Sequence, residues 1–159
     1  MKKILGASIG SDVHVAGLLN FLELAKNEGY ETVNLGAAVP ISRVIESIEK
    51  EKPTIVALSY RLGAVALSNL LDEFARGIEK IGVGDKIDFI FGGTTETSEI
   101  AAQSGIFKKI FDGSEEEEDV VLFLRGQMKY REKQDYPDSL PERIAFKHHG
   151  ESIGCGFED

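Results

Sequence analysis

The chain has 159 residues, 42% of them hydrophobic and 28% charged, and a formal net charge of −9 at pH 7. This length suits one domain with its own core, and the acidic balance argues against the basic face that nonspecific nucleic-acid binding requires. The lone cysteine rules out a disulfide framework within these residues, and no apolar run is long enough to span a membrane. Polar residues from Ser8 onward interrupt the first apolar run before a signal-peptide core can form, so we expect a cytoplasmic protein.

Short apolar runs alternate along the chain with segments that carry apolar side chains at helical spacing. Glycine or proline ends several segments, as Gly29 and Pro53 do. In chain order we predict strand 3–8, helix 17–28, strand 31–35, helix 41–50, strand 54–59, helix 64–81, strand 87–91, helix 97–103, strand 107–111 and a last helix that Ser114 opens.

This repeated alternation predicts the fold class α/β: an open, doubly wound, five-stranded parallel sheet with helices on both faces. Such sheets bind ligands outside the carboxyl ends of their strands. The segments that directly follow the predicted strands are therefore the candidate ligand-binding segments. They are residues 9–17, 36–38, 59–63, 92–95 and 112–113.

The alternation stops near residue 128, and we predict that the domain occupies residues 1–128. Residues 129–141 are charged, contain two prolines and show no helical or strand period. We interpret residues 129–159 as a linker, a C-terminal tail or the start of a further segment.

The first candidate loop contains Asp12 and His14, two residues apart. In an extended loop their side chains lie on the same side, and a carboxylate bound to one imidazole nitrogen makes the other nitrogen a better metal ligand. The alternative is that Asp12 caps the following helix and His14 is an ordinary surface residue. One His and one Asp do not make a zinc site, whereas a single His suits a metal held in a macrocycle such as a haem or a corrin.

The segment Asp12-Val13-His14-Val15-Ala16-Gly17 matches the Asp-x-His-x-x-Gly motif of the cobalamin-binding domain family. This domain occurs in glutamate mutase, methylmalonyl-CoA mutase and methionine synthase. Two later family features follow in order: Ser59-Tyr60-Arg61 stands where the family has Ser-x-Leu, and Gly92-Gly93 matches its Gly-Gly. The chain therefore resembles this family over residues 3–127, and the segment 33–36 is similar to the glutamate mutase small subunit.

The resemblance implies a flavodoxin-like sheet that binds cobalamin base-off, with His14 as the lower ligand of the cobalt. Asp12 would hydrogen-bond the other imidazole nitrogen. The displaced dimethylbenzimidazole tail would descend between the sheet and its helices, where Ser59 would hydrogen-bond the benzimidazole nitrogen.

In the same resemblance, Gly17, Gly92 and Gly93 would leave room for the nucleotide tail, and Thr94 and Thr95 would offer hydroxyls to its phosphate or ribose. Arg61 departs from the family leucine, and an arginine must keep its charge solvated or paired. The full set of predicted cofactor contacts is Ser11, Asp12, His14, Val15, Gly17, Ser59, Arg61, Leu62, Gly92, Gly93, Thr94, Asp112 and Gly113, with His14 as the metal ligand.

The resemblance leaves three functions open. We favour the cobalamin-binding component of an adenosylcobalamin-dependent carbon-skeleton mutase, which would work with a separate TIM-barrel catalytic subunit, because the domain begins at residue 3 without a helical module before it. The first alternative is a corrinoid methyl carrier of a methyltransferase system, which would hold methylcobalamin. The second is a non-catalytic cobalamin-binding module. A phosphoacceptor receiver domain is disfavoured, because no acidic pair follows the first predicted strand directly.

Overall fold

The computed structural model describes residues 2–126. In chain order the elements are β1 (Lys3–Ser8), α1 (Ala16–Asn27), β2 (Glu31–Asn34), α2 (Ile41–Glu51), β3 (Ile55–Tyr60), α3 (Ala64–Ile81), β4 (Asp88–Gly93), α4 (Thr95–Ser104), β5 (Lys109–Phe111) and α5 (Glu117–Leu124). The predicted boundary at residue 128 and the predicted tail 129–159 lie outside the described residues.

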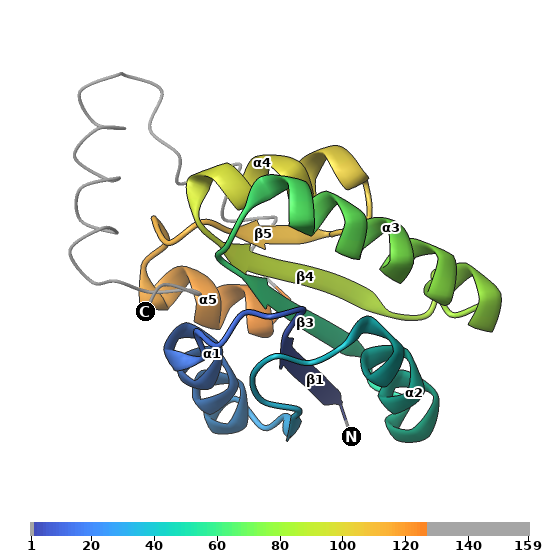
Figure 1. The fold of residues 1–159 in the computed structure, drawn as a ribbon. Helices are drawn as coiled ribbons and strands as arrows, with labels where there is room; N and C mark the ends of the chain where they lie inside the picture. The colour runs from blue at the N-terminus through green and yellow to red at the C-terminus, as the bar shows by residue number, and fades with distance from the viewer. Residues whose placement is uncertain (1, 127–159) are drawn as a thin grey trace.

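The five strands form one parallel sheet in the order β2-β1-β3-β4-β5. Helices α1 and α5 cover one face of the sheet, and α2, α3 and α4 cover the other (Figure 1). The strand order reverses between β1 and β3, which is the switch point at which doubly wound sheets bind ligands. The predicted flavodoxin-like α/β fold is therefore confirmed.

The core consists of two hydrophobic clusters, one on each face of the sheet. Alternate residues of each strand contribute to each cluster: Val56 and Leu58 face α2, α3 and α4, whereas Ile55 and Ala57 face α1 and α5. The sheet is covered on both faces, so its central strands are apolar at most positions, and all six residues of β3 are buried.

Glycine allows close packing of helices onto the sheet and onto each other. A Cβ on Gly6 would lie 3.1 Å from side-chain atoms of both Leu18 and Leu22, and one on Gly77 would lie 2.7 Å from the Ile45 side chain. The first contact brings α1 against β1, so the loop that precedes α1 is held close to the end of β1.

Several boundaries differ from the predicted ones because strands continue further than their apolar runs. β3 extends to Tyr60 and β4 extends to Gly93, so the Gly92-Gly93 pair lies within a strand instead of after it. The last helix begins at Glu117 instead of near Ser114. Residues 112–115 form a separate hydrogen-bonded turn before it.

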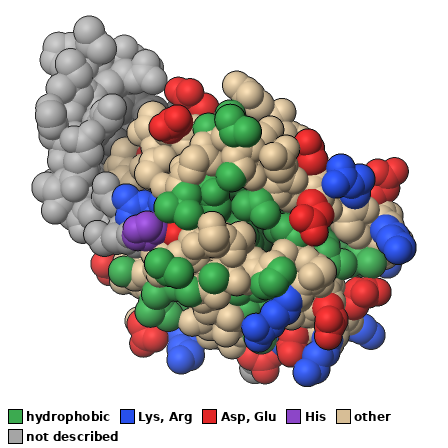
Figure 2. Space-filling view, in the orientation of Figure 1, with side chains coloured by type: hydrophobic (Ala, Val, Ile, Leu, Met, Phe, Trp, Pro, Cys, Tyr) green, Lys and Arg blue, Asp and Glu red, His purple; other side chains and the backbone are tan. Residues whose placement is uncertain are grey.

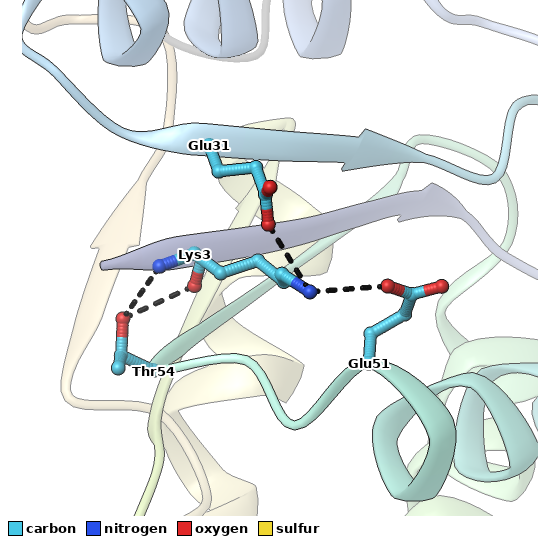
Figure 3. A network of polar contacts seen from close by, with 4 residues as sticks. All are labelled: Lys3, Glu31, Glu51 and Thr54. Atoms are coloured by element: carbon cyan, nitrogen blue, oxygen red, sulfur yellow. Dashed lines mark hydrogen bonds and ion pairs between the residues drawn. The ribbon is translucent and has the colours of Figure 1, made fainter. Parts of the chain in front are cut away.

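The amino end of the sheet carries a surface ion-pair network (Figure 3). The Lys3 ammonium lies 3.1 Å from a carboxylate oxygen of Glu31 and 3.2 Å from one of Glu51. The Thr54 hydroxyl donates to the Lys3 carbonyl at 3.1 Å. These contacts join β1 to β2, to the end of α2 and to the residue before β3.

Candidate functional site

The candidate site lies at the carboxyl ends of β1 and β3, where the sheet order reverses. Ser8, Ser59 and Gly92 are register partners across β1, β3 and β4. Beyond them the β1–α1 loop continues through Gly10, whose N–H donates to the Val39 carbonyl at 3.0 Å. This loop therefore lies between the β2–α2 loop and the end of β3.

The Asp12 side chain is fully buried and makes three hydrogen bonds. One carboxylate oxygen accepts from the His14 backbone N–H at 2.9 Å and lies 2.6 Å from His14 Nδ1. The other oxygen accepts from the Arg61 backbone N–H at 2.6 Å. Both oxygens are thus engaged, and the orientation of the carboxylate is fixed from two different loops.

These contacts decide between the two interpretations of Asp12. The first residue before α1 is Val15, and no side chain caps this helix. Asp12 therefore does not act as a helix cap, and that part of the alternative is wrong. The role of His14 as a metal ligand stays a prediction. The predicted contact of Asp12 with one imidazole nitrogen is confirmed.

The His14 imidazole lies partly exposed above the buried Asp12 carboxylate. Its side chain is 43% exposed, whereas the Asp12 side chain beneath it has no exposed surface. The contact with Asp12 uses Nδ1, so a bond from this ring to a metal has to be made by Nε2. A carboxylate on the far nitrogen of a metal-binding imidazole is a recurrent arrangement, because it fixes the tautomer and raises the basicity of the ligand.

Arg61 takes part in the site through its main chain. The bond to Asp12 comes from the backbone N–H of Arg61, which is available whatever side chain the residue carries. The replacement of the family leucine by arginine therefore leaves this contact intact. It is a backbone contact between distant segments, so no residue type in the sequence signals it.

Two further residues that sequence analysis did not select bind the backbone of Asp12. The Ser8 hydroxyl donates to the Asp12 carbonyl at 3.0 Å, and the Ala38 N–H donates to the same oxygen at 2.8 Å. Ser8 is fully buried at the end of β1. A polar residue that ends an apolar strand was the available signal for Ser8, whereas nothing in the sequence pointed to Ala38.

The predicted cofactor contacts Ser59 and Gly92 share the face of the sheet that α1 and α5 cover. Ser59 is buried, and it follows Ile55 and Ala57 of that face by strand alternation. Gly92 is its register partner on β4 and therefore lies on the same face. The structure thus brings together two of the residues that the resemblance assigns to the nucleotide tail.

Gly93 lies on the opposite face and has a packing role there. A Cβ at this position would lie 2.4 Å from Thr97 Oγ1 and 2.5 Å from the Tyr60 carbonyl oxygen. Such distances are far below van der Waals contact, so only glycine fits here. A contact of Gly93 with the cofactor remains a prediction. Packing against Tyr60 and Thr97 already explains why this position is a glycine.

Thr94 uses its hydroxyl to begin α4. Thr94 Oγ1 accepts from the Thr97 N–H at 3.2 Å, and Thr97 Oγ1 accepts from the Thr94 N–H at 2.9 Å. This reciprocal cap satisfies backbone donors that the first helical turn leaves unpaired. A contact from Thr94 to a phosphate or ribose therefore has to coexist with the cap.

Asp112 and Gly113 belong to a tight turn between β5 and α5 that Glu115 closes. The Glu115 carboxylate accepts from the Asp112 N–H at 3.3 Å and from the Gly113 N–H at 3.1 Å. Burial, together with the nearby charge of Asp112, raises the pKa of Glu115 to about 7. Hydrogen bonds from its own turn oppose this rise only partly.

Three exposed apolar side chains lie in the loops that follow β1 and β3 or in the first turn of α3. Val13 is 66% exposed, Leu62 is 40% exposed and Val65 is 79% exposed. The bond from Arg61 to Asp12 brings the β3–α3 loop, with Leu62, beside the loop of Val13 and His14. Figure 2 shows hydrophobic side chains gathered over the middle of this view, with charged side chains mostly toward its margins. An exposed apolar surface near the His14 loop suits a large flat ligand.

The other predicted contacts lie in the same loop or at its end. Ser11 is exposed in the turn that the Asp12 N–H closes on the Ile9 carbonyl at 3.2 Å. Val15 is half-buried at the start of α1, and Gly17 is buried in its first turn. The β1–α1 loop thus contributes four of the predicted residues, and the first turn of α1 contributes the fifth, Gly17.

Comparison with protein families agrees with this geometry. Residues 2–121 match the B12 binding domain family, so the chain belongs to that family. The cobalamin-binding domain inferred from the Asp-x-His-x-x-Gly motif is therefore confirmed at the level of the family.

Two relatives illustrate the range of proteins that share this domain. The chain is 30% identical over 98 residues to the trimethylamine corrinoid protein of Methanosarcina barkeri, which covers 62% of the chain and 41% of that protein. It is 25% identical over 136 residues to D-ornithine 4,5-aminomutase subunit beta of Acetoanaerobium sticklandii, which covers 82% of the chain and 18% of that subunit. The chain thus spans less than half the length of these relatives.

Among solved structures, the fold is similar to the methanol:cobalamin methyltransferase complex MtaBC of Methanosarcina barkeri. The TM-score is 0.64 at 19% identity, over 91% of this chain and 51% of that one. At this identity the likeness supports the fold.

None of the helices between residues 2 and 126 has the length and apolar character needed to cross a membrane.

Proposed function

We propose that the chain is the corrinoid-carrying component of a methyltransferase system, with His14 Nε2 as the lower ligand of cobalt. The observation that carries the ligand assignment is the contact between His14 Nδ1 and the buried Asp12 carboxylate at 2.6 Å. This contact fixes the ring and leaves coordination to the other nitrogen. A bound corrinoid would supply the cobalt that accepts and donates the methyl group.

The protein's own residues would bind and orient the cofactor. Val13 and Leu62 would contact the apolar edge of the macrocycle, while Ser59 and Gly92 would line the channel for the nucleotide tail between the sheet and α1. Exposed Val65 would lie at the rim, where a separate catalytic subunit, such as a barrel-shaped methyltransferase, would approach. Asp12 would accept a hydrogen bond from Nδ1 and so fix the imidazole tautomer and ring orientation in which Nε2 can act as a ligand.

The choice of methyl transfer over a mutase follows the relatives. A trimethylamine corrinoid protein and methionine synthase each match at 30% identity, whereas the aminomutase subunit matches at 25%. Sequence analysis favoured the mutase component because of where the domain begins, and a start position carries less weight than similarity. Methylcobalamin therefore replaces adenosylcobalamin as the favoured cofactor.

The mutase component remains the second candidate, because the aminomutase subunit aligns over a larger share of this chain than the methyl carriers do. In that case the domain would bind adenosylcobalamin and present it to a catalytic partner that holds the substrate.

The ligand assignment is tested by loading the purified protein with cobalamin, desalting it and recording the EPR spectrum of the Co(II) form. We expect superhyperfine splitting from one histidine nitrogen, which changes from three lines to two when the histidines are labelled with ¹⁵N. His14→Ala should lose this splitting. A loaded wild-type protein without histidine coupling would contradict the assignment.

The reaction class is tested by loading the protein with [¹⁴C-methyl]cobalamin and adding extract of the organism that makes it, together with a thiol acceptor. We expect label to move to the acceptor, at a rate that falls at least tenfold in His14→Ala. The opposite result would be no methyl transfer, together with isomerase activity that the adenosylcobalamin-loaded protein restores to the extract. That result would establish the second candidate.

A further inference from the structure

The backbone of Asp12 is held as firmly as its side chain. Its carbonyl oxygen accepts from the Ser8 hydroxyl at 3.0 Å and from the Ala38 N–H at 2.8 Å, and its own N–H donates to the Ile9 carbonyl at 3.2 Å. The Asp12 carbonyl belongs to the peptide unit that leads into Val13 and His14. Because a peptide unit is planar, fixing this oxygen also fixes the orientation of the Asp12–Val13 peptide that leads to His14.

Ala38 reaches this carbonyl in an unusual backbone conformation. Its φ is +53°, in the left-handed region that costs a residue with a Cβ about 1 kcal/mol. Neighbouring hydrogen bonds hold it there: the Val39 N–H donates to the Ser8 carbonyl at 2.9 Å, and the Ser8 N–H donates to the Gly36 carbonyl at 2.9 Å. Backbone strain of this kind persists where the surroundings over-determine it, as they do at functional sites.

Ser8 thus occupies a central position in this arrangement. Its N–H and carbonyl bind the β2–α2 loop, and its hydroxyl binds the Asp12 carbonyl. Ser8 is fully buried, so water does not replace the hydroxyl if it is removed. The Asp12 carbonyl would then retain a single donor, from Ala38, and the peptide that leads to His14 would gain freedom to rotate.

We propose that Ser8 is a positioning residue of the His14 site, whose hydroxyl keeps the Asp12 carboxylate aligned with His14 Nδ1. This inference rests on the proposed role of His14 as the cobalt ligand. Ser8 would affect the fraction of bound cobalt that His14 coordinates. It would do so through Asp12, without contacting the cofactor itself. Ser8→Ala should therefore shift the loaded protein toward a state in which His14 is dissociated from the cobalt.

The test compares Ser8→Ala with Thr54→Val. Thr54 provides a matched control because its hydroxyl also donates to a backbone carbonyl of β1, that of Lys3, at the opposite end of the strand (Figure 3). The first measurement uses the protein without cofactor and follows amide hydrogen exchange at His14 and Arg61, whose N–H groups bind the Asp12 carboxylate. The second measures the fraction of Co(II) EPR intensity that carries histidine-nitrogen splitting.

We expect exchange at both amides to accelerate about threefold to tenfold in Ser8→Ala, the range that the loss of one ordinary hydrogen bond predicts. Exchange at Ala57 in the centre of β3 serves as the reference for global opening and should change less. The fraction of histidine-coordinated Co(II) should fall in Ser8→Ala and stay at the wild-type value in Thr54→Val.

The inference is overturned if both variants match the wild type in exchange at His14 and Arg61, or if Ser8→Ala accelerates exchange while the coordinated fraction is unchanged. Failure of the proposed function looks different, because the wild-type protein itself would then show no histidine splitting. The exchange measurement would still report whether Ser8 holds the Asp12 network.

Discussion

At the amino end of the sheet Lys3 contacts Glu31 and Glu51, and at the carboxyl end Asp12 contacts His14 and the Arg61 backbone. Both groups join segments that are distant in sequence. The Lys3 network is partly exposed, and water and salt screen it. The Asp12 carboxylate is buried, and all of its stabilisation comes from the protein.

The comparison teaches that charge serves different purposes at the two ends. Exposed ion pairs such as those of Lys3 contribute little and tolerate change. A buried carboxylate is costly unless its oxygens are fully bonded, so Asp12 requires a defined loop geometry around it. That same geometry orients His14. We therefore expect substitutions at the carboxyl end to affect both stability and the site, and substitutions at the amino end to affect neither strongly.

The largest effect should come from Asp12→Ala. It leaves the part-buried N–H groups of His14 and Arg61 without their acceptor. We expect a loss of about 2 to 5 kcal/mol in the free energy of unfolding, because each unsatisfied group costs about 1 to 3 kcal/mol. Histidine coordination of Co(II) should disappear as well. Urea unfolding of the cofactor-free protein measures the first effect. The matched control is Asp88→Ala at the amino end, whose carboxylate pairs with Lys108 on the surface and should change stability little. Equal losses in the two variants would break the comparison.

Gly93→Ala should have the next largest effect. The added Cβ would contact the Tyr60 carbonyl and Thr97 Oγ1, and we expect a loss of about 1 to 3 kcal/mol in unfolding free energy even without cofactor. This outcome would show that position 93 requires glycine for packing within the protein, and not to leave space for the nucleotide tail. A variant as stable as the wild type that binds cobalamin more weakly would show instead that Gly93 serves the cofactor.

Glu115→Gln should change how stability depends on pH. The pKa of Glu115 is raised to about 7 in the folded protein, mainly by burial. The folded state therefore binds more protons than the unfolded state between about pH 4.5 and 7, so this group makes stability fall as pH rises through that window.

Removing the Glu115 charge should remove this decrease in stability with rising pH. We expect Glu115→Gln to resemble the wild type near pH 5 and to be more stable by on the order of 1 to 2 kcal/mol at pH 8. Urea unfolding at the two pH values measures the difference between variant and wild type. An unchanged difference across this range would mean that the turn between β5 and α5 does not hold Glu115 as described.

The smallest effect should come from Lys3→Met. The hydrogen bonds that the Lys3 ammonium donates to Glu31 and Glu51 raise the pKa of Lys3, but the pairs lie near the surface. We expect a small decrease in the thermal midpoint, which vanishes in about 1 M NaCl because salt screens the pairs. The midpoint is measured by circular dichroism at low and high salt. A decrease as large as that of Asp12→Ala, or one that salt does not alter, would remove the distinction between the two ends.

The sequence alone determined the succession of strands and helices along the chain. Each element must bury one or both of its faces in the core, so its apolar residues recur with the period of a helix or of a strand. The sequence also determined the pair Asp12 and His14, since two residues of one loop need no distant partner to be recognised. Ser59 and Gly92 followed from the family pattern, and strand register then placed them side by side on one face.

Only the tertiary structure decided how that loop is held. The N–H of Arg61, the N–H of Ala38 and the hydroxyl of Ser8 converge on Asp12 from three different segments. Two of these donors are backbone groups, which every residue except proline possesses, so the residue type carries no trace of their role. The same holds for Gly93, whose requirement arises from the Tyr60 carbonyl on a neighbouring strand. Contacts of this kind depend on which segments the fold brings together, and that is settled only when the sheet and its helices have packed.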